Sequence, residues 1–351
     1  MFKNYLYNEK AVKHSFDINN VDLSIINGIR RTILTDIPVI GFIGEDDPTV
    51  DIINNNGPLH DELLIHRIGL IPLHLNEEQT ETYVDNDLEF ELNITNDNNN
   101  IKNVYTNSIT GTNKGVELTK KELQTIFPPN NITKSYILIT RLRTGEYLNF
   151  KAKAVKRTAR LNASFSPVSL CNLFYNQDES LIDESTDILD KERLYYKNKY
   201  GDPTSVKFEI ESLNGLSFNY LIIKSIEIIT DKLNKLRENI LNDKIKIEQF
   251  QDLENTYDFY IENEDDTLGN IVQSLLHNKY IRENQQINNI KCKYVGYICP
   301  HPLKYLLIIR LTLEDQKNKS VFINFLDSNC KLICEDLMRI SIEFNKFIST
   351  I

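Results

Sequence analysis

The chain has 351 residues, 41% of them apolar, which is enough to bury one large core or two ordinary ones. Its net charge of −10, from 50 acidic and 40 basic residues, argues against a protein whose main work is to coat nucleic acid, because that work requires a surplus of cations. Five irregularly spaced cysteines favour reduced thiols over disulfides, so we expect an intracellular protein with no membrane-spanning segment.

An amphipathic helix is predicted first, from Asp22 to Asp36, with Asp22 as its N-cap and Pro38 ending it. The predicted buried face consists of Ile26, Ile29, Ile33 and Ile37. Arg30 falls at the edge of this face, where a guanidinium requires a partner, and we expect that partner to be Asp61 or Glu62. Arg31 falls on the polar side and is expected to be free to contact another protein.

Residues 66–75, HRIGLIPLHL, pass from a polar helix end into an apolar strand-like stretch, with Gly69 and Pro72 shaping the bend. A catalytic role for His66 and Arg67 would need a nucleophile or a pair of carboxylates nearby. We interpret the stretch as a structural or subunit-contact corner.

Strand-like periodicity follows from residue 80 to 150, interrupted by Asn- and Gly-rich turns, and predicts a β-rich insert. The basic cluster KAKAVKRTAR, from Lys151 to Arg160, then suggests either contact with nucleic acid or an acidic partner surface, or a solvated strand edge that lysines protect from sheet extension. Residues 176–205 are mostly polar and predict an exposed loop with one or two helical turns.

Two long helices with apolar seams are predicted in the remainder. The first runs from Asn219 to Asp252, and the second carries an apolar stripe that begins at Phe322. Their proposed pairing residues are Ile226, Ile229, Leu233 and Leu236 on the first helix and Ile333, Leu337, Ile340 and Phe344 on the second.

The order of elements occurs twice. Each half runs from a short helix through strands to a long helix, and Asn27 in IINGIRR corresponds to Asn270 in LGNIVQS. The repeated order indicates the two halves of a heterodimer fused into one polypeptide chain.

Five stretches in this order resemble the alpha-like assembly subunits of multisubunit DNA-directed RNA polymerases. Four stretches resemble the larger subunit: NNVDLSIINGIRRTILTDIP, DELLIHRIGLIPLHL, RLRTGEYLNFKAKAVKRTARLNASFSPV and VKFEIESLNGLSFNYLIIKSIEIITDKL. The fifth, ENEDDTLGNIVQSLL with YVGYICPHPL, resembles the smaller subunit. The loop 176–205 lies outside the resemblance. Leu161 and Asn162 stand where the family commonly has a Glu-His pair, and Gln273 where the smaller subunit commonly has Arg.

The resemblance implies an α+β fold in which two alpha-like dimerisation halves pair through helices. We expect the larger half at 1–75 and 150–252, the β-rich insert domain at 76–149, and the smaller half at 256–351. The implied subunit-interface residues are Asn27, Arg30, Arg31, His66, Arg67, Gly69, Pro72, Asp265, Thr267, Leu268, Gly269, Asn270, His301 and Pro302.

The implied function is a non-catalytic assembly platform of a DNA-dependent RNA polymerase. Its expected partners are the largest and second-largest subunits and small zinc-bearing adaptor subunits, with DNA and RNA met only in the complex. Fusion of the halves and a composition rich in Asn and Ile but with five Ala suggest a large DNA virus. The expected location is then host cytoplasm and virion, and otherwise the nucleus.

No cofactor or metal is expected. The stretch 73–91 has no cysteine for the zinc loop common in eukaryotic larger subunits, and His60, His66 and His74 have no metal-ligand spacing. Cys292, Cys299, His301, Cys330 and Cys334 are better candidates but are also poorly spaced. The alternatives are a sequence-unspecific DNA-binding module using Lys151 to Arg160, and a small metal-dependent enzyme built on the histidines and C-terminal cysteines.

Overall fold

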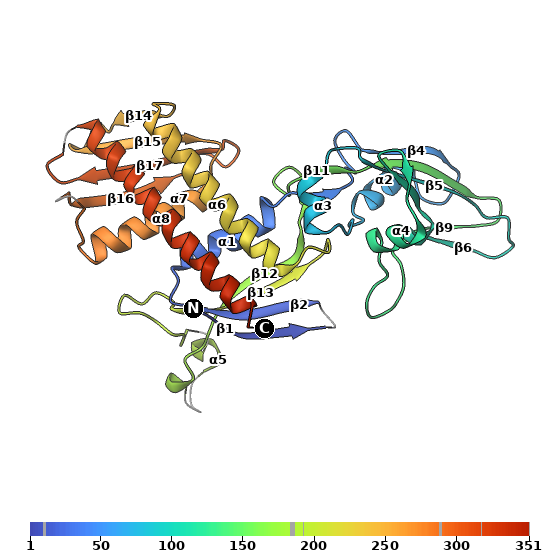
Figure 1. Ribbon diagram of the computed structural model, residues 1–351, viewed down its shortest axis with the longest axis horizontal. Coiled ribbons are helices and arrows are strands. Elements are labelled where there is room, and N and C mark those ends of the chain that lie inside the picture. The colour runs from blue at the N-terminus through green and yellow to red at the C-terminus, as the bar shows by residue number, and fades with distance from the viewer. Residues whose placement is uncertain (10–11, 183–186, 192, 288–289, 317, 351) are drawn as a thin grey trace.

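The computed structural model describes residues 1–9, 12–182, 187–191, 193–287, 290–316 and 318–350. Two bodies lie side by side (Figure 1): one holds the long helices and two sheets, and the other is mainly strands. We call residues 1–241 without the insert the first unit, and residues from 242 onward the second unit. The mixed α/β architecture with several antiparallel sheets agrees with the predicted class.

The first unit contains a four-stranded antiparallel sheet in the order β1-β2-β13-β12. Its strands are β1 (Phe2–Asn8), β2 (Lys13–Asn19), β12 (Val168–Tyr175) and β13 (Ser205–Ser212). Helix α1 (Leu23–Thr35) follows β2 and is capped by the Asp22 side chain, as predicted. Helix α6 (Phe218–Leu241) follows β13 and is capped by Ser217.

The second unit contains another four-stranded antiparallel sheet, in the order β14-β15-β17-β16. Its strands are β14 (Lys246–Gln249), β15 (Thr256–Glu262), β16 (Cys292–Ile298) and β17 (Leu306–Leu313). Its helices are α7 (Asp266–Leu276), the π-helix η4 (His277–Arg282) and α8 (Lys319–Ile348). The sequence places a short helix after β15, as after β2, and a long helix after β17, as after β13. The two sheets therefore share one strand order.

The long helix predicted to reach Asp252 ends eleven residues earlier, at Leu241. Asp243 takes a left-handed backbone conformation with φ of 52°, which stops the helix, and Ile247 lies on β14 opposite Phe259. Ile247 fitted the helical periodicity because a buried residue on a strand can fall at the same spacing. The prediction was wrong past Leu241, and the connection between the units is itself a strand.

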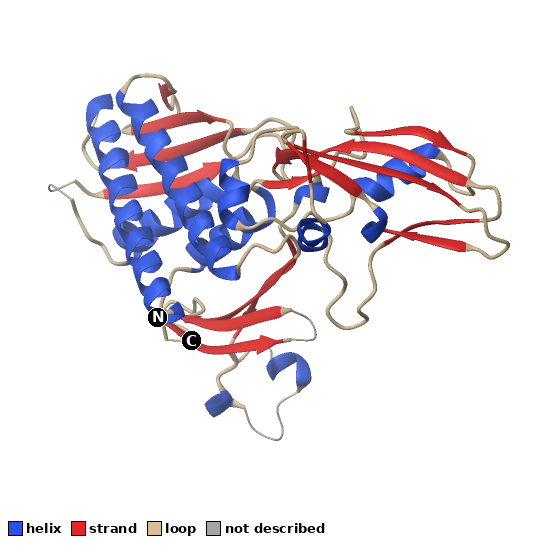
Figure 2. Ribbon diagram, turned by 45° about the vertical axis from the view of Figure 1, so that its right-hand side comes forward, coloured by secondary structure: helices blue, strands red, loops and turns tan. Residues whose placement is uncertain are grey.

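The long helices α6 and α8 pack against each other and share one hydrophobic core with both sheets (Figures 1 and 2). Arg237 on α6 donates from Nε to Asp327 on α8 at 2.8 Å, and α8 reaches the first sheet, where Phe344 lies 5.2 Å from the ring of Phe2. The buried core includes all eight proposed pairing residues, Ile226, Ile229, Leu233, Leu236, Ile333, Leu337, Ile340 and Phe344. Separating the units would expose this core to water, so we expect them to stay together if the chain is cut between them.

A second hydrophobic cluster fills the other body. Its elements are β3 (Val39–Gly41), β4 (Val50–Asn55), α2 (Asp61–Gly69), α3 (Glu77–Thr82), β5 (Leu88–Thr95), β6 (Lys102–Tyr105), β7 (Thr110–Asn113), β8 (Val116–Glu117), α4 (Lys120–Ile126), β9 (Leu138–Leu142), β10 (Tyr147–Lys153) and β11 (Val155–Arg157), with the 3₁₀ turn η1 (Thr106–Ser108).

The insert's packing begins earlier in the chain than the sequence suggested. Buried side chains from Ile40 to Leu75 belong to the second cluster, and β4 pairs with β10 of the five-stranded sheet. The stretch after α2 forms no strand in the described structure, although Ile71, Leu73 and Leu75 alternate inward as strand residues would. The domain boundaries stay a prediction, but packing places residues 40–75 with the insert because their apolar side chains meet those of β5 and β10.

The loop 176–205 projects from the first sheet (Figure 1), and the only helical segments in its described residues are the short η3 (Glu179–Leu181) and α5 (Ile188–Lys191). This agrees with the predicted exposed loop. The remaining 3₁₀ turn, η2 (Ala163–Phe165), lies between β11 and β12. No helix of the described residues is both long and apolar enough to cross a membrane.

Candidate functional site

Helices α1 and α7 cross in reciprocal contact between the two units. Each begins with an aspartate N-cap, Asp22 and Asp265, and carries an asparagine five residues later, Asn27 and Asn270. They approach closely, since a Cβ added at Gly28 would lie 2.6 Å from Cδ1 of Ile271. Glycine at this position therefore permits the close crossing.

Polar contacts join the ends of the two helices in a similar way. Arg31 of α1 donates from Nε to Oγ1 of Thr267 in the first turn of α7, at 2.9 Å. Nine residues after the N-cap of α7, as Arg31 is after Asp22, Ser274 donates to Asp22 at 3.2 Å. Each helix therefore reaches the beginning of the other.

Arg30 and Arg31 differ from the sequence expectation. Arg30 donates from Nε to Oδ1 of Asn27 at 3.0 Å, and Asp61 accepts a hydrogen bond from Asn55, so the expected Arg30 pairing with α2 is wrong. The reason is that α2 packs in the second cluster. Arg31 was expected to reach another protein, and instead contacts the second unit of its own chain.

Five charged side chains meet where α1 ends and α7 begins. Arg160 donates to Asp36 at 2.9 Å and to Asp265 at 3.0 Å, and Lys232 of α6 donates to Asp36 at 2.6 Å. Glu264 completes the group, with Oε2 at 3.7 Å from Nζ of Lys232. We call these five residues the junction network. It ties α1, α6, the chain leaving the insert and the start of α7 to one another.

The junction network changes the acidity of its members. Burial disfavours ionisation of Asp36, but Lys232 and Arg160 outweigh it and hold the pKa of Asp36 below its ordinary value. Burial is also the largest influence on Glu264, and there it prevails and raises the pKa, since Oε2 of Glu264 is buried without a hydrogen-bond partner. The pKa values of Asp36 and Glu264 are therefore shifted in opposite directions, although both carboxyl groups lie beside Lys232.

The basic cluster from Lys151 to Arg160 is paired with acids along its length. Lys151 and Lys153 lie on β10 directly opposite Glu91 and Glu89 of β5, with Lys153 at 3.1 Å from its partner. Further along, Arg157 contacts Asp85 at 2.6 Å, Lys156 donates to the Glu81 carbonyl, and Arg160 joins the junction network. Strand β10 is interior to its sheet, so the expected strand edge is wrong for Lys151 and Lys153, whereas Lys156 and Arg157 lie on β11, an edge strand of a two-stranded sheet. This arrangement of paired charges does not support the DNA-binding alternative.

The corner at residues 66–72 is structural in its contacts. Exposed His66 lies 3.3 Å from Glu45, and Arg67 donates to the carbonyls of Leu138 and Ile139, which ties α2 to β9. A Cβ on Gly69 would lie 2.8 Å from the backbone of Gly44, so this position requires glycine. Pro72 is half-buried in the extended stretch that follows.

The remaining predicted interface residues lie on α7 and the loop before β17. Leu268 is buried, and a Cβ on Gly269 would meet the Tyr297 ring at 2.6 Å. His301 and Pro302 are exposed, and Nδ1 of His301 accepts from the backbone of Leu303. Within the described residues, no three His, Cys, Asp or Glu side chains are grouped to hold a metal ion.

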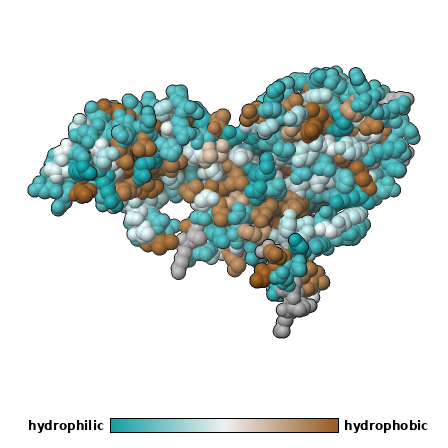
Figure 3. Space-filling model, turned by 180° about the vertical axis from the view of Figure 1, so that it is seen from behind, coloured by the Kyte–Doolittle hydropathy of each residue, from teal (hydrophilic) through white to brown (hydrophobic). Residues whose placement is uncertain are grey.

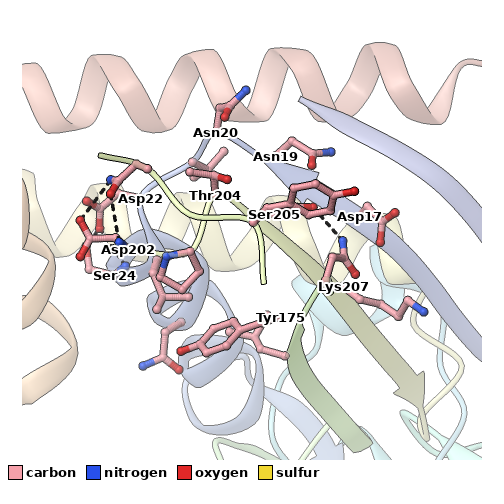
Figure 4. Close-up of a pocket in the computed structure, with 18 of the residues that line it drawn as sticks. Asp17, Asn19, Asn20, Asp22, Ser24, Tyr175, Asp202, Thr204, Ser205 and Lys207 are labelled. Atoms are coloured by element: carbon pink, nitrogen blue, oxygen red, sulfur yellow. Dashed lines mark hydrogen bonds between the residues drawn. The ribbon is translucent and has the colours of Figure 1, made fainter. Parts of the chain in front are cut away.

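An open groove of about 2340 Å³ runs beside the α1–α7 crossing. Figure 4 shows Asp22, Ser24 and Asp202 together at one end and Asp17 and Lys207 at the other. Asn27, Arg30, Asn270 and Gln273 also line it, so predicted interface residues from both units contribute to one surface.

Sequence reasoning missed Lys232, Glu264 and the junction role of Arg160. Lys232 follows an apolar seam and looks like an ordinary surface lysine. One usable signal was the run ENEDD at 262–266, where adjacent carboxylates just before a helix require cations nearby.

Comparison with known proteins gives a family. The model of the RNA polymerase Rpb3/Rpb11 dimerisation domain matches residues 15–233. Subunit RPAC1 of DNA-directed RNA polymerases I and III is 27% identical over 189 residues in Homo sapiens, covering 48% of this chain and 52% of the relative. The Saccharomyces cerevisiae protein of that name is 27% identical over 185 residues, covering 45% and 52%. Subunit rpb3 of DNA-directed RNA polymerase II from Dictyostelium discoideum is 24% identical over 186 residues, covering 49% and 58%. The chain spans about half the length of these relatives.

Proposed function

The chain belongs to the RNA polymerase Rpb3/Rpb11 dimerisation family, and we propose that it is the assembly platform on which the two large catalytic subunits of a multisubunit DNA-dependent RNA polymerase are brought together. Its relatives are polymerase subunits, and the chain is a non-catalytic subunit of this kind.

The proposal assigns the larger alpha-like half to the first unit and the smaller half to the second. The observation that carries it is the common strand order of the two sheets, each with a short helix after one strand and a long helix after another. The shared core of α6 and α8 supports intramolecular pairing of the halves. A short connection keeps the effective concentration of one half near the other at about mM, so neither accumulates alone.

We assign docking of the second-largest subunit to the groove beside α1 and α7. Asn27, Arg30, Asn270 and Gln273 offer donors and acceptors from both units, so that the surface is complete only when the units are paired. On the face shown in Figure 3, hydrophobic residues gather between the two bodies, whereas the outer surface of each is mainly hydrophilic. Contact with the largest subunit and with small zinc-bearing adaptors is part of the same proposal, with His66, Arg67, His301 and Pro302 as candidate contacts.

The fused arrangement, together with the composition, favours a large DNA virus as the source. In that case the polymerase would act in the host cytoplasm and be carried in the virion, and otherwise it would act in the nucleus. Nucleic acid would be met only through the assembled complex, since the basic cluster is paired with acids.

The test is co-expression of the full chain with the two large subunits of its own polymerase, followed by affinity purification through the chain. We expect the parent to retain both subunits. Arg30→Glu, which reverses the charge at this position of the groove, should lower capture of the second-largest subunit about tenfold or more. Lys331→Glu on an exposed position of α8 is the matched control and should capture as the parent does.

The outcomes separate two parts of the proposal. A parent chain that purifies without either large subunit would remove the platform function. An Arg30→Glu variant that captures the second-largest subunit as well as the parent would leave the function and refute the groove assignment.

A further inference from the structure

A rigid turn near the end of the loop 176–205 faces the second unit. Oδ1 of Asn198 accepts from the backbone N–H groups of Tyr200 and Asp202, and Gly201 has φ of 89°, a conformation that favours glycine. Lys197 and Pro203 form a β-bridge across the turn. These local bonds hold the turn in shape, so little conformational entropy is lost when it contacts another surface.

The turn binds the guanidinium group of one arginine of the second unit. Arg282, the last residue of η4, forms an ion pair with Asp202 and lies 5.2 Å from the centre of the Tyr200 ring. The Tyr200 hydroxyl donates to the carbonyl oxygen of Arg282 at 3.1 Å. An ion pair, a cation–π contact and a hydrogen bond thus meet at Arg282, and a lysine could not reproduce this planar geometry.

The polar contacts of Arg282 extend to the N-terminus of α1. Arg282 donates to Oδ1 of Asn278 at 3.0 Å, and Asn278 donates from Nδ2 to Oδ2 of Asp22 at 2.8 Å. Asp22 is the N-cap of α1, and its carboxylate also accepts from Ser274. The turn, η4 and the first turn of α1 are therefore joined by consecutive polar contacts, and Figure 4 shows Asp22 and Asp202 at the same end of the groove.

We propose that residues 197–203 form a clasp by which the first unit recognises the second unit of its own chain, with Arg282 as the specificity-determining residue. Most of the contact between α6 and α8 is apolar, and apolar contact is non-directional, so it supplies affinity but sets the relative position of the units weakly. The directional contacts between the units include the Arg237–Asp327 ion pair, the junction network and the turn at 197–203. Directional charged contacts set register and exclude wrong partners. The clasp goes beyond the platform function, which requires pairing of the units but no recognition by this loop.

Side-chain exposure indicates what the clasp contributes. Arg282 is 30% exposed and Asp202 is 38% exposed, so water screens the ion pair in part. We therefore expect the clasp to set the relative position of the units and, once the connection between them is cut, how fast they exchange, while the apolar core supplies most of the stability.

The experiment uses the full chain with a specific protease site placed at residues 242–245, between α6 and β14, where the second unit begins. After cleavage, exchange of units with a differently labelled cleaved chain is followed by fluorescence energy transfer. The urea concentration is chosen so that the parent exchanges over hours. Arg282→Glu should speed exchange about tenfold or more, because it replaces attraction to Asp202 by repulsion. Asp202→Lys should act similarly, and the double charge exchange should return the rate to within about threefold of the parent.

Two further variants keep the result interpretable. Tyr200→Phe removes only the hydroxyl, so folding is preserved, and it should speed exchange about two- to fivefold. Arg339→Glu is the matched control, since Arg339 pairs with Asp336 on the same helix and both are exposed. The proposal is overturned if Arg282→Glu and Tyr200→Phe exchange at the rate of Arg339→Glu, or if the double variant exchanges as fast as the single ones.

Discussion

Replacing Arg160 with alanine tests whether the junction network holds the molecule together. The guanidinium group forms three hydrogen bonds to Asp36, at 3.0, 2.9 and 3.2 Å, and one to Asp265, at 3.0 Å. The side chain of Asp36 is only 8% exposed, so its carboxylate cannot be hydrated fully after the change. Lys232 would remain beside two buried carboxylates, Asp36 and Glu264.

The expected loss follows from burial and from what remains. Removing one partner of a buried ion pair costs about 3–5 kcal/mol. Here Arg160 is 28% exposed and Lys232 still compensates Asp36, so we expect a loss of about 2–3 kcal/mol in the free energy of unfolding. At about 2.1 cal/mol/K per residue, the unfolding entropy of this 351-residue chain is about 0.74 kcal/mol/K, so the melting temperature should fall by roughly 3–4 °C.

Thermal melts of the full chain, followed by circular dichroism, measure this loss. The matched control is Lys153→Ala, in the same basic cluster, where a 57% exposed lysine meets an exposed glutamate. A surface pair of this kind contributes about 0–1 kcal/mol, so the control should melt within roughly 2 °C of the parent. If Arg160→Ala and Lys153→Ala have the same melting temperature, the junction network does not stabilise the fold and the reasoning from burial is wrong.

Three other changes test different parts of the structure. Gly69→Ala should destabilise the insert by about 1–3 kcal/mol because its Cβ would meet the backbone of Gly44, and proteolysis should then cut the insert before the helical body. Glu264→Gln should raise the melting temperature at pH 7, since the raised pKa means that folding disfavours the ionised form; this advantage should vanish as the pH falls below the ordinary value of 4.5, and an advantage that grew in acid would contradict the assignment. In fluorescence-anisotropy titrations, duplex DNA should bind to the isolated chain no more tightly than about 10⁻⁴ to 10⁻⁶ M at physiological salt, and a tighter, steeply salt-dependent affinity would revive the DNA-binding alternative.

Local signals in the sequence were sufficient for much of the fold. Helix α1 has an aspartate cap and four isoleucines at helical spacing, and the structure places its ends within a residue of the predicted ones. The apolar seams of α6 and α8 were readable for the same reason, because burial along a helix repeats with a fixed period. The repeated order of short helix, strands and long helix was visible before any contact was known.

The errors concern contacts between distant segments. Periodicity could not reveal that the chain turns at Asp243 and that Ile247 belongs to a strand, since that depends on a left-handed residue and on pairing with β15. Sequence reasoning assigned Arg30 the wrong partner, although Asn27 lies only three residues earlier on the same helix. The partner of Arg31, Thr267, lies 236 residues away, so no local pattern could identify it. The clasp went unnoticed because a polar loop has no periodicity, although Asn198 followed by Gly201 is a turn signal.

The insert also affects when the first sheet can form during synthesis. Strand β2 pairs with β13, and Lys13 and Glu209, which form an ion pair across these strands, are 196 residues apart. Ribosomes add about 5–20 residues per second, so β1, β2 and the apolar face of α1 must wait roughly 10–40 s for β13 to emerge. The second sheet closes over a far shorter interval, since β15 and β17 pair between residues about 50 apart, as in Thr256 with Thr312 at a separation of 56. In a nascent chain, the apolar faces of β2 and α1 therefore stay exposed while the insert is made, and they are surfaces for a chaperone to cover.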